Sequence, residues 1–515
     1  MVIQTRFGTG SVRPDGNKSV SYGLIRTCGT VLRMLGISDL LKGMKSRGVS
    51  LDVIVELVCA YQLQGGSSMN ECADWLDDDV LKMKLCGGET ISQRTIDRSL
   101  AVLSDHFEEI IDGIWEGINR IFDIECTDVV VDGLHIPVVG RMNSLSAYGY
   151  GGRGIQNQVQ FMLGMLRCPT LPFDIMPYPG NMTDQEQYRN FLPRLFKRMT
   201  PGSMIVVDNG CAHKDLKKMI TDAGMEYLTR ERMNNSDDRR IDEHPEDFTY
   251  TDTDVCCIVN TFTASGRTLY QFFSVDNYLR GMQIAVKKEA KCAKVIAEGS
   301  VVGETPKVRT SDIVKKLNNP YLNVEIKTVV QMIMSPFDPS DKAEAITELM
   351  GGRCGYFKLE CSIPLPPEKA LDIYRARIRI EHLISSIKSV VNIEPLRVWS
   401  DGSTNGSLLL ALLAQLVVSV VIELMEGIRE EVSENGRRSV RVRKPSAIFA
   451  VKSLSHLTVS FLYDDQGAES VVYSNFEPMN TEIMGILDRM EACLDPFSGE
   501  KWQKRGIFVE ERLRR

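Results

Sequence analysis

The segment from residue 127 to residue 230 most constrains the fold, because short strand-like runs alternate there with amphipathic ones. TDVVVDGLH predicts a strand, VQFMLGMLRC and LPFDIMPYPG predict two more, and polar, glycine-rich sequence (SAYGYGGRGIQNQ) follows the first. These runs are short and separated by turn residues, which favours an antiparallel meander. The order continues with a helix at DQEQYRNFLPRLFKRM, a strand at SMIVVD, a helix at AHKDLKKMITDAG and a strand at MEYLTR. The predicted order β-β-β-α-β-α-β indicates an α/β domain.

Two aspartates occupy comparable positions in this order. Asp132 lies within or just after the first strand, and Asp208 ends the strand SMIVVD. Asp132 precedes a glycine and could be a turn residue, and Asp208-Asn209-Gly210 could form a hairpin turn. A helix rather than a strand follows Asp208, which argues against the hairpin. Taken singly, each aspartate is more often structural than catalytic, so a third acidic residue is needed.

The stretch PPEKALDIYRARIRIEHLISSIKSVV at 366–391 predicts one long helix with two prolines in its first turn. At roughly 100° per residue, four polar side chains fall within about 60° of one another. They are Tyr374, Arg377, Glu381 and Lys388. One helix face is therefore expected to carry a carboxylate, an arginine one turn before it and a lysine two turns after it. The alternative is a solvated helix edge stabilised by neighbouring opposite charges.

The spacing Tyr-x2-Arg-x3-Glu-x6-Lys resembles the YREK signature of DDE transposases of bacterial and archaeal insertion sequences, the IS-four type. The resemblance implies an RNase H-like catalytic core of the retroviral integrase superfamily. It implies that Asp132, Asp208 and Glu381 are catalytic residues and metal ligands. It further implies that Tyr374, Arg377 and Lys388 contact DNA.

The donor set suits a particular metal chemistry. Three carboxylates without a convergent His or Cys match the oxygen ligands that Mg²⁺, or Mn²⁺, prefers. Two such ions, about 3.5–4 Å apart, activate a water molecule and stabilise the leaving oxygen in phosphodiester cleavage. The resemblance implies that Asp132 bridges both ions and that Asp208 and Glu381 each complete one. Arg377 and Lys388 would hold phosphates, and Tyr374 would contact the DNA backbone or position Glu381.

The sequence divides into five predicted segments. A helical N-terminal DNA-binding domain is expected at 1–124, and the RNase H-like core at 125–230 and 366–430. A β-rich insertion is expected at 231–365, and a tail domain of no assigned role at 431–515. The insertion contains no tryptophan, although such a residue stacks on a flipped base in some members of this group; Tyr270, Phe272, Phe273 or Tyr278 could replace it. A DNA hairpin intermediate therefore stays an open question.

The N-terminal segment has a pattern that fits a helix-turn-helix. SMNECADWL and TISQRTIDRSLAVL predict two helices joined by a glycine-containing connection, and Ser92 is placed to cap the second. Residues near the start of that helix would then reach bases and phosphates; they are Gln93, Arg94, Thr95 and Arg98. An ordinary helical bundle is the alternative.

Composition favours a soluble, cytoplasmic chain, and the resemblance implies association with the nucleoid. The 515 residues are 43% hydrophobic and 25% charged, and the 13 cysteines show no zinc spacing. The N-terminus has no apolar signal-peptide core, and LLLALLAQLVVSVVIELM, interrupted by Gln415 and Glu423, predicts a buried helix rather than a membrane span. The net charge of −7 is unusual for a DNA-binding protein. Basic clusters such as RRSVRVRK could still provide a local DNA surface.

The sequence thus predicts a cut-and-paste transposase that cleaves insertion-sequence ends with Mg²⁺ and joins them to target DNA. Its expected partner is double-stranded DNA, both terminal inverted repeats and target, with a homodimer on paired ends implied by the resemblance and no membrane. Two alternatives stay open. One is an RNase H-like nuclease without joining activity, and the other is a catalytically silent, transposase-derived DNA-binding protein.

Overall fold

The computed structural model falls into two compact units. The first comprises Met1–Val206, Asp222–Met225 and Ala376–Arg515, and the second Val207–Thr221 and Glu226–Arg375. The structure describes residues 2–5, 8–11, 18–122, 124, 127–139, 143–151, 154–208, 213–233, 246–249, 255–264, 266–275, 277–281, 355–397, 399–434, 446–463 and 469–490.

The strands expected at 127–230 are present, and they arrange Asp132 within the sheet of the first unit. β6 (Gly154–Leu166) pairs antiparallel with β4 (Val129–Pro137) along one edge and with β7 (Pro172–Pro179) along the other. β4 also pairs in parallel with β8 (Met204–Val207). The predicted helix after β7 is α8 (Asp184–Phe196), which begins with a capping box formed by Thr183 and Glu186. This order matches the sequence-based prediction.

One strand was not predicted. The glycine-rich stretch contains β5 (Ala147–Gly151), which forms a hairpin with the first part of β6. Two glycines let this hairpin approach the turn after β7: a Cβ atom on Gly149 would lie 1.9 Å from the Gly180 oxygen, and one on Gly180 would lie 1.9 Å from the Gln158 oxygen. The Gln158 and Gln160 side chains donate hydrogen bonds of 3.0 and 2.7 Å to that same Gly180 oxygen. Side chains larger than hydrogen are therefore excluded here.

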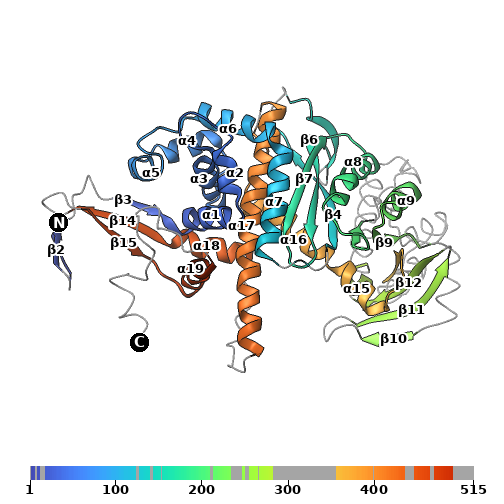
Figure 1. The fold of residues 1–515 in the computed structure, drawn as a ribbon. Helices are drawn as coiled ribbons and strands as arrows, with labels where there is room; N and C mark the ends of the chain where they lie inside the picture. Colours follow the sequence, from blue (N-terminus) through green and yellow to red (C-terminus); the bar gives the residue numbers. More distant parts are fainter. Residues whose placement is uncertain are drawn as a thin grey trace, which may run out of the picture. The chain divides into compact units, whose positions relative to one another are not determined.

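A long helix, α17 (Asp401–Glu434), forms the centre of the first unit. It packs against β7 and against the N-terminal helices α1 (Tyr22–Met34), α3 (Leu51–Leu63) and α6 (Gln93–Asp105) (Figure 1). Its part from Asp401 to Glu426 is long and apolar enough to cross a membrane by length and composition, but 83% of its apolar window is buried inside the protein. The expected buried core helix is thus what the structure contains.

The C-terminal segment packs with the N-terminal one. β3 (Lys18–Ser21) pairs with β14 (Thr458–Tyr463), which pairs with β15 (Glu469–Ser474). Two further helices, α18 (Ala447–His456) and α19 (Pro478–Met490), pack on α1. β14, β15 and α19 give the segment expected at 431–515 a strand pair and a helix. The pairing of the two ends of the chain was not predicted.

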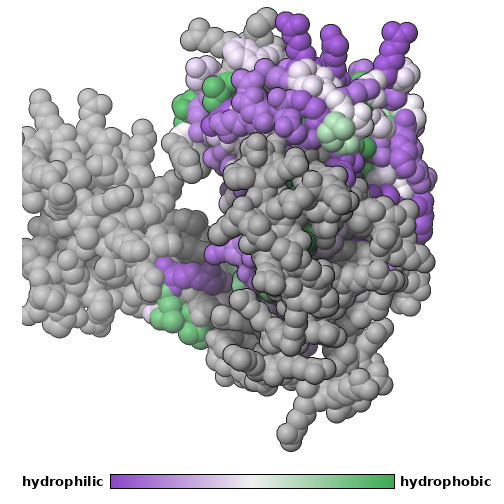
Figure 2. Space-filling model, turned by 90° about the vertical axis from the view of Figure 1, so that its left-hand side faces the viewer, coloured by the Kyte–Doolittle hydropathy of each residue, from purple (hydrophilic) through white to green (hydrophobic). Residues whose placement is uncertain are grey.

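The remaining N-terminal elements are mostly helical. They are the strand pair β1 (Val2–Thr5) and β2 (Gly8–Ser11), and the helices α2 (Ile37–Lys42), α4 (Met69–Leu76), α5 (Asp79–Leu85) and α7 (Phe107–Ile121). Ser92 caps α6 as predicted, since its hydroxyl accepts a hydrogen bond of 3.3 Å from the Thr95 N–H. Gln93, Arg94 and Arg98 are exposed on that helix. Seen from the left-hand side of Figure 1, the described surface is largely hydrophilic, with small, separate apolar areas (Figure 2).

The second unit contains an antiparallel sheet. Its strands follow the order β10 (Glu246–Thr249), β11 (Val255–Ala264), β12 (Arg267–Ser274), β13 (Tyr356–Cys361) and β9 (Glu226–Glu231). Two helices accompany it, α9 (Lys214–Asp222) and α15 (Pro367–Arg375). β10, β11, β12 and β13 lie in the segment expected to be β-rich, and residues 282–354 of that segment lie outside the described residues. Division of the chain into five domains stays a prediction.

Candidate active site

Asp132 lies on β4, directly after three valines that are completely buried. Its side chain is 19% exposed. The Asp132 Oδ1 atom accepts a hydrogen bond of 2.9 Å from the Gly133 N–H, and Oδ2 accepts one of 3.1 Å from Arg377 Nη2. The buried valines hold the strand in the sheet, so the carboxylate has a fixed position at the protein surface.

Arg377 begins α16 (Arg377–Ser389), a helix that packs on β4 through its apolar stripe. The arginine side chain is only 10% exposed, and the nitrogen that contacts Asp132 is also 3.9 Å from Glu381 Oε1. Glu381 is more accessible, with 58% of its side chain exposed. One guanidinium therefore lies between two of the three predicted catalytic acids and neutralises part of their mutual repulsion.

The prediction of one helix at 366–391 is wrong. α15 ends at Arg375 and α16 begins at Arg377, with a turn residue, Ala376, between them. The break falls where the chain passes from the second compact unit to the first. Arg377, Glu381 and Lys388 share α16, whereas Tyr374 belongs to α15.

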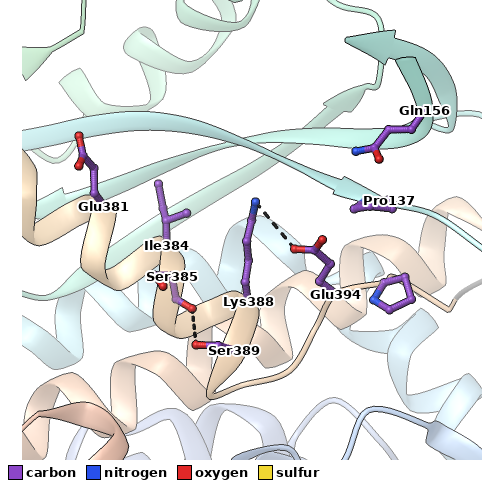
Figure 3. A pocket seen from close by; sticks show the side chains of 9 residues that line it. Pro137, Gln156, Glu381, Ile384, Ser385, Lys388, Ser389 and Glu394 are labelled. Atoms are coloured by element: carbon purple, nitrogen blue, oxygen red, sulfur yellow. Dashed lines mark hydrogen bonds and ion pairs between the residues drawn. The ribbon is translucent and has the colours of Figure 1, made fainter. Parts of the chain in front are cut away.

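Lys388 lies two turns beyond Glu381 on α16, and Figure 3 shows both side chains projecting from the same side of the helix. Its Nζ atom is 3.9 Å from the Glu394 Oε2 atom. Lys388, Glu394 and Glu381 line a recess of about 830 Å³. The other residues that line it are Pro137, Gln156, Ile384, Ser385, Ser389 and Pro395.

His135, on β4, lies within reach of the same charges. Burial lowers the pKa of its imidazole, the positive charge of Lys388 lowers it further, and the carboxylates of Glu394 and Asp184 oppose this shift. The imidazole is therefore neutral at physiological pH. A second histidine, His213, follows Asp208 in the chain; it is exposed, and its Nδ1 atom is 3.9 Å from Asp215 Oδ2.

Asp208 directly follows β8, as the sequence predicted. β8 pairs in parallel with β4 through Val129 and Ile205, and through Val130 and Val206. Asp208 is half-buried, and its carbonyl oxygen accepts a hydrogen bond of 3.2 Å from the Thr229 hydroxyl. The structure thus brings together Asp132, Arg377 and Glu381, and the participation of Asp208 and Tyr374 stays a prediction.

The acidic side chains fit a divalent cation in kind, because carboxylate oxygens are the ligands that Mg²⁺ and Mn²⁺ prefer. In the described part of the chain, no group of three or more His, Cys, Asp or Glu residues is close enough to hold a metal ion. Asp132 and Glu381 are instead connected through Arg377.

Sequence reasoning missed four polar residues of the recess, and Glu394 is the charged one; the others are Gln156, Ser385 and Ser389. Glu394 opens the run EPLRVWSDGSTNG, which follows α16. No spacing rule connects this residue with Lys388, since their proximity depends on how the loop after α16 folds back.

A protein family and a solved structure are similar to this chain. The model of the family described as "Transposase DDE domain" matches residues 128–416, more than half of the chain. A solved structure, the cryo-EM structure of a piggyBac transposase synaptic complex with hairpin DNA, is similar over 85% of this chain and 80% of its own, with 9% sequence identity and a TM-score of 0.40. No curated protein matches the sequence. The chain belongs to the transposase DDE domain family and is a DDE transposase.

Proposed function

We propose that this transposase cleaves the ends of an insertion sequence in a reaction that depends on Mg²⁺, and joins them to target DNA by a cut-and-paste route. The observation that carries the proposal is the position of Arg377 between Asp132 and Glu381, at 3.1 and 3.9 Å. All three residues lie within the segment that matches the family. The YREK spacing supports membership of the IS-four type with an RNase H-like core.

Asp208 is the third acid that we propose. It ends β8, the strand that pairs in parallel with the strand carrying Asp132. DDE transposases generally use divalent metal ions, and we propose two Mg²⁺ or Mn²⁺ ions held by Asp132, Asp208 and Glu381. Such ions supply an activated water molecule and stabilise the leaving oxygen of the phosphodiester.

The remaining side chains bind and orient. Arg377 is largely buried and hydrogen-bonded to Asp132, so we assign it the task of fixing the two acids, in addition to any phosphate contact. Lys388 lines the recess beside Glu381 and offers a point charge to a DNA phosphate. Tyr374 is half-buried at the end of α15, and we retain it as a DNA-backbone contact. Two copies on paired DNA ends, in the cytoplasm at the nucleoid, complete the proposal.

The test is cleavage of a DNA fragment that carries the ends flanking the gene. Asp132→Asn, Asp208→Asn and Glu381→Gln should each abolish Mg²⁺-dependent cleavage while DNA binding survives. Glu116→Gln, which changes an exposed acid on α7 by the same one charge, is the matched control. Normal cleavage by Glu381→Gln would contradict the assignment.

The two alternatives predict other outcomes in the same assay. A nuclease without joining activity would cut the ends but give no product covalently joined to target DNA. A silent DNA-binding protein would bind the fragment and leave it intact with either Mg²⁺ or Mn²⁺. Joined product that depends on all three acids would support transposition.

A further inference from the structure

The recess beside Glu381 contains an ion pair that the family signature does not include. Lys388 Nζ lies 3.9 Å from Glu394 Oε2, and the two side chains are 28% and 24% exposed (Figure 3). The same recess is lined by Glu381, so two carboxylates face it with one lysine. An incoming DNA phosphate therefore meets more negative than positive charge on these three side chains.

The backbone holds Glu394 in this position. Leu396, two residues further on, donates its N–H to the Pro137 oxygen at 2.9 Å, and its own oxygen accepts the Val139 N–H at 3.0 Å. The flanking side chains Ile393 and Leu396 are 5% and 3% exposed. Backbone hydrogen bonds thus attach the loop to the end of β4 after Glu394, and a buried side chain lies on each side of Glu394.

The other end of the loop is fastened too. Asn392 adopts a left-handed backbone conformation with φ of 58°, which asparagine tolerates better than most residues. Its side-chain amide donates a hydrogen bond of 2.7 Å to the Gly65 oxygen. Glu394 is therefore placed opposite Lys388 by the fold, in contrast to two long side chains that meet by chance on an open surface.

We infer that Glu394 is an internal competitor for the DNA phosphate at Lys388 and so limits the affinity of the recess for DNA. This inference rests on the proposed contact between Lys388 and a phosphate. A phosphate that approaches the ammonium must either separate the ion pair or bind beside the negative charge of Glu394.

The competition has a consequence for selectivity. A single phosphate contact in the recess gains little, because the lysine already has a counterion. DNA that makes further contacts elsewhere on the protein can still displace Glu394 from Lys388. DNA that is bound through its phosphates alone binds weakly. Discrimination against the wrong partner through an opposing charge is a general route to specificity.

The test measures binding of a random-sequence duplex of about 30 base pairs by fluorescence anisotropy at about 0.1 M salt. Glu394→Gln keeps the side-chain shape and removes the charge. It should tighten binding about three- to tenfold, the range expected for one partly exposed charge pair. Lys388→Met should weaken binding, and adding Glu394→Gln to Lys388→Met should change it less than twofold, as expected when the interaction partner is already gone.

Two comparisons keep the test specific. Glu116→Gln changes the net charge equally but lies on α7, and it should leave the affinity unchanged. The inference is overturned if Glu394→Gln leaves the DNA affinity the same or lowers it. It is also overturned if Glu394→Gln tightens binding equally in the Lys388→Met background. Failure of the proposed function would instead appear as absent Mg²⁺-dependent cleavage by the unaltered protein, which is a separate measurement.

Discussion

Arg377 and Asp132 are 245 residues apart in the chain, yet Arg377 Nη2 lies 3.1 Å from Asp132 Oδ2. The arginine side chain is 10% exposed and the aspartate side chain 19%. A charge pair so far from bulk water depends strongly on both partners, because removal of one leaves the other poorly solvated. The same nitrogen is 3.9 Å from Glu381. Arg377 therefore fixes the relative position of two acids that come from β4 and α16.

Arg377→Met should slow single-turnover end cleavage about 100-fold, the scale on which a small misplacement of reacting groups acts. Without the guanidinium the two carboxylates repel each other, Asp132 loses a hydrogen-bond donor and Glu381 loses an ion-pair partner. DNA affinity should fall less than tenfold, since Arg377 is largely buried. Cleavage at saturating Mg²⁺ and anisotropy with the same DNA separate the two effects.

Arg379→Gln is the matched control, because this exposed arginine lies on the same helix and its guanidinium donates to the Thr170 hydroxyl at 3.2 Å. Its cleavage rate should stay within about twofold of the unaltered protein, as is usual for an exposed surface position. If Arg377→Met loses binding and cleavage in proportion, its main task is to bind phosphate, as the sequence alone had suggested.

The alternation of apolar runs and turn residues was sufficient to predict most of the core. β7, β8 and the second half of β6 are mostly buried, and β4 begins with three buried valines, so the composition of these runs carries the signal. β5 gave no such signal, because its tyrosines Tyr148 and Tyr150 are 75% and 80% exposed. Its pairing depends on two glycines that permit a close backbone approach.

The candidate site was predicted in part for similar reasons. The spacing of Arg377 and Glu381 follows from helical periodicity, which is a local property. The break at Ala376 does not, since the helical periodicity of the sequence continues through it. The proximity of Lys388 and Glu394 depends on backbone hydrogen bonds of the following loop, for which side-chain patterns give no rule.

A buried ion network connects the sheet with the N-terminal helices. Asp174 on β7 is completely buried and accepts hydrogen bonds of 2.9 Å from Arg194 and 3.0 Å from Arg198. The two arginines continue to Glu108 and Asp112 on α7. Asp174→Ala should lower the free energy of unfolding by about 3–5 kcal/mol, because two arginines lose their buried counterion.

Urea unfolding followed by circular dichroism measures this effect, with Asp112→Ala as the control. Asp112 contacts the same Arg198 but is 62% exposed, so its loss should cost less than about 1 kcal/mol. Equal losses for the two variants would show that burial of Asp174 is not what makes the network stabilising.

Glu56 should make stability depend on pH. Burial raises the pKa of its carboxyl to about 7, against the opposing charge of Arg33. A Cβ atom on Gly29 would lie 2.5 Å from the Glu56 carboxylate, which shows how closely this group packs on α1. Because the pKa is higher in the folded state, folded protein binds more protons between about pH 4.5 and 7, and stability falls as pH rises through this window.

Glu56→Gln should therefore raise the melting temperature at about pH 8 and leave it nearly unchanged at about pH 4.5, where the carboxyl is largely protonated in the folded protein. Thermal unfolding of both proteins across this range gives the difference directly, and Glu116→Gln controls for the loss of one exposed charge. A stabilisation of equal size at both pH values would contradict the raised pKa.

The ion pair of Arg26 with Asp488 joins the two ends of the chain, since Arg26 lies on α1 and Asp488 on α19. The arginine side chain is 2% exposed and also donates to the Tyr22 hydroxyl at 2.8 Å. Asp488→Ala should lower the free energy of unfolding by about 2–4 kcal/mol, because Arg26 stays buried while its carboxylate partner is gone.

Replacement of both partners distinguishes this pair from general packing of α19. Arg26→Met combined with Asp488→Leu removes both charges and keeps apolar volume, so stability should recover by more than half of the loss in Asp488→Ala. Asp77→Ala, which breaks an ion pair with Lys82 at a position 57% exposed, should cost less than about 1 kcal/mol. If the double variant is no more stable than Asp488→Ala, the tail is held by apolar contacts of α19 and α1, and the ion pair contributes only orientation.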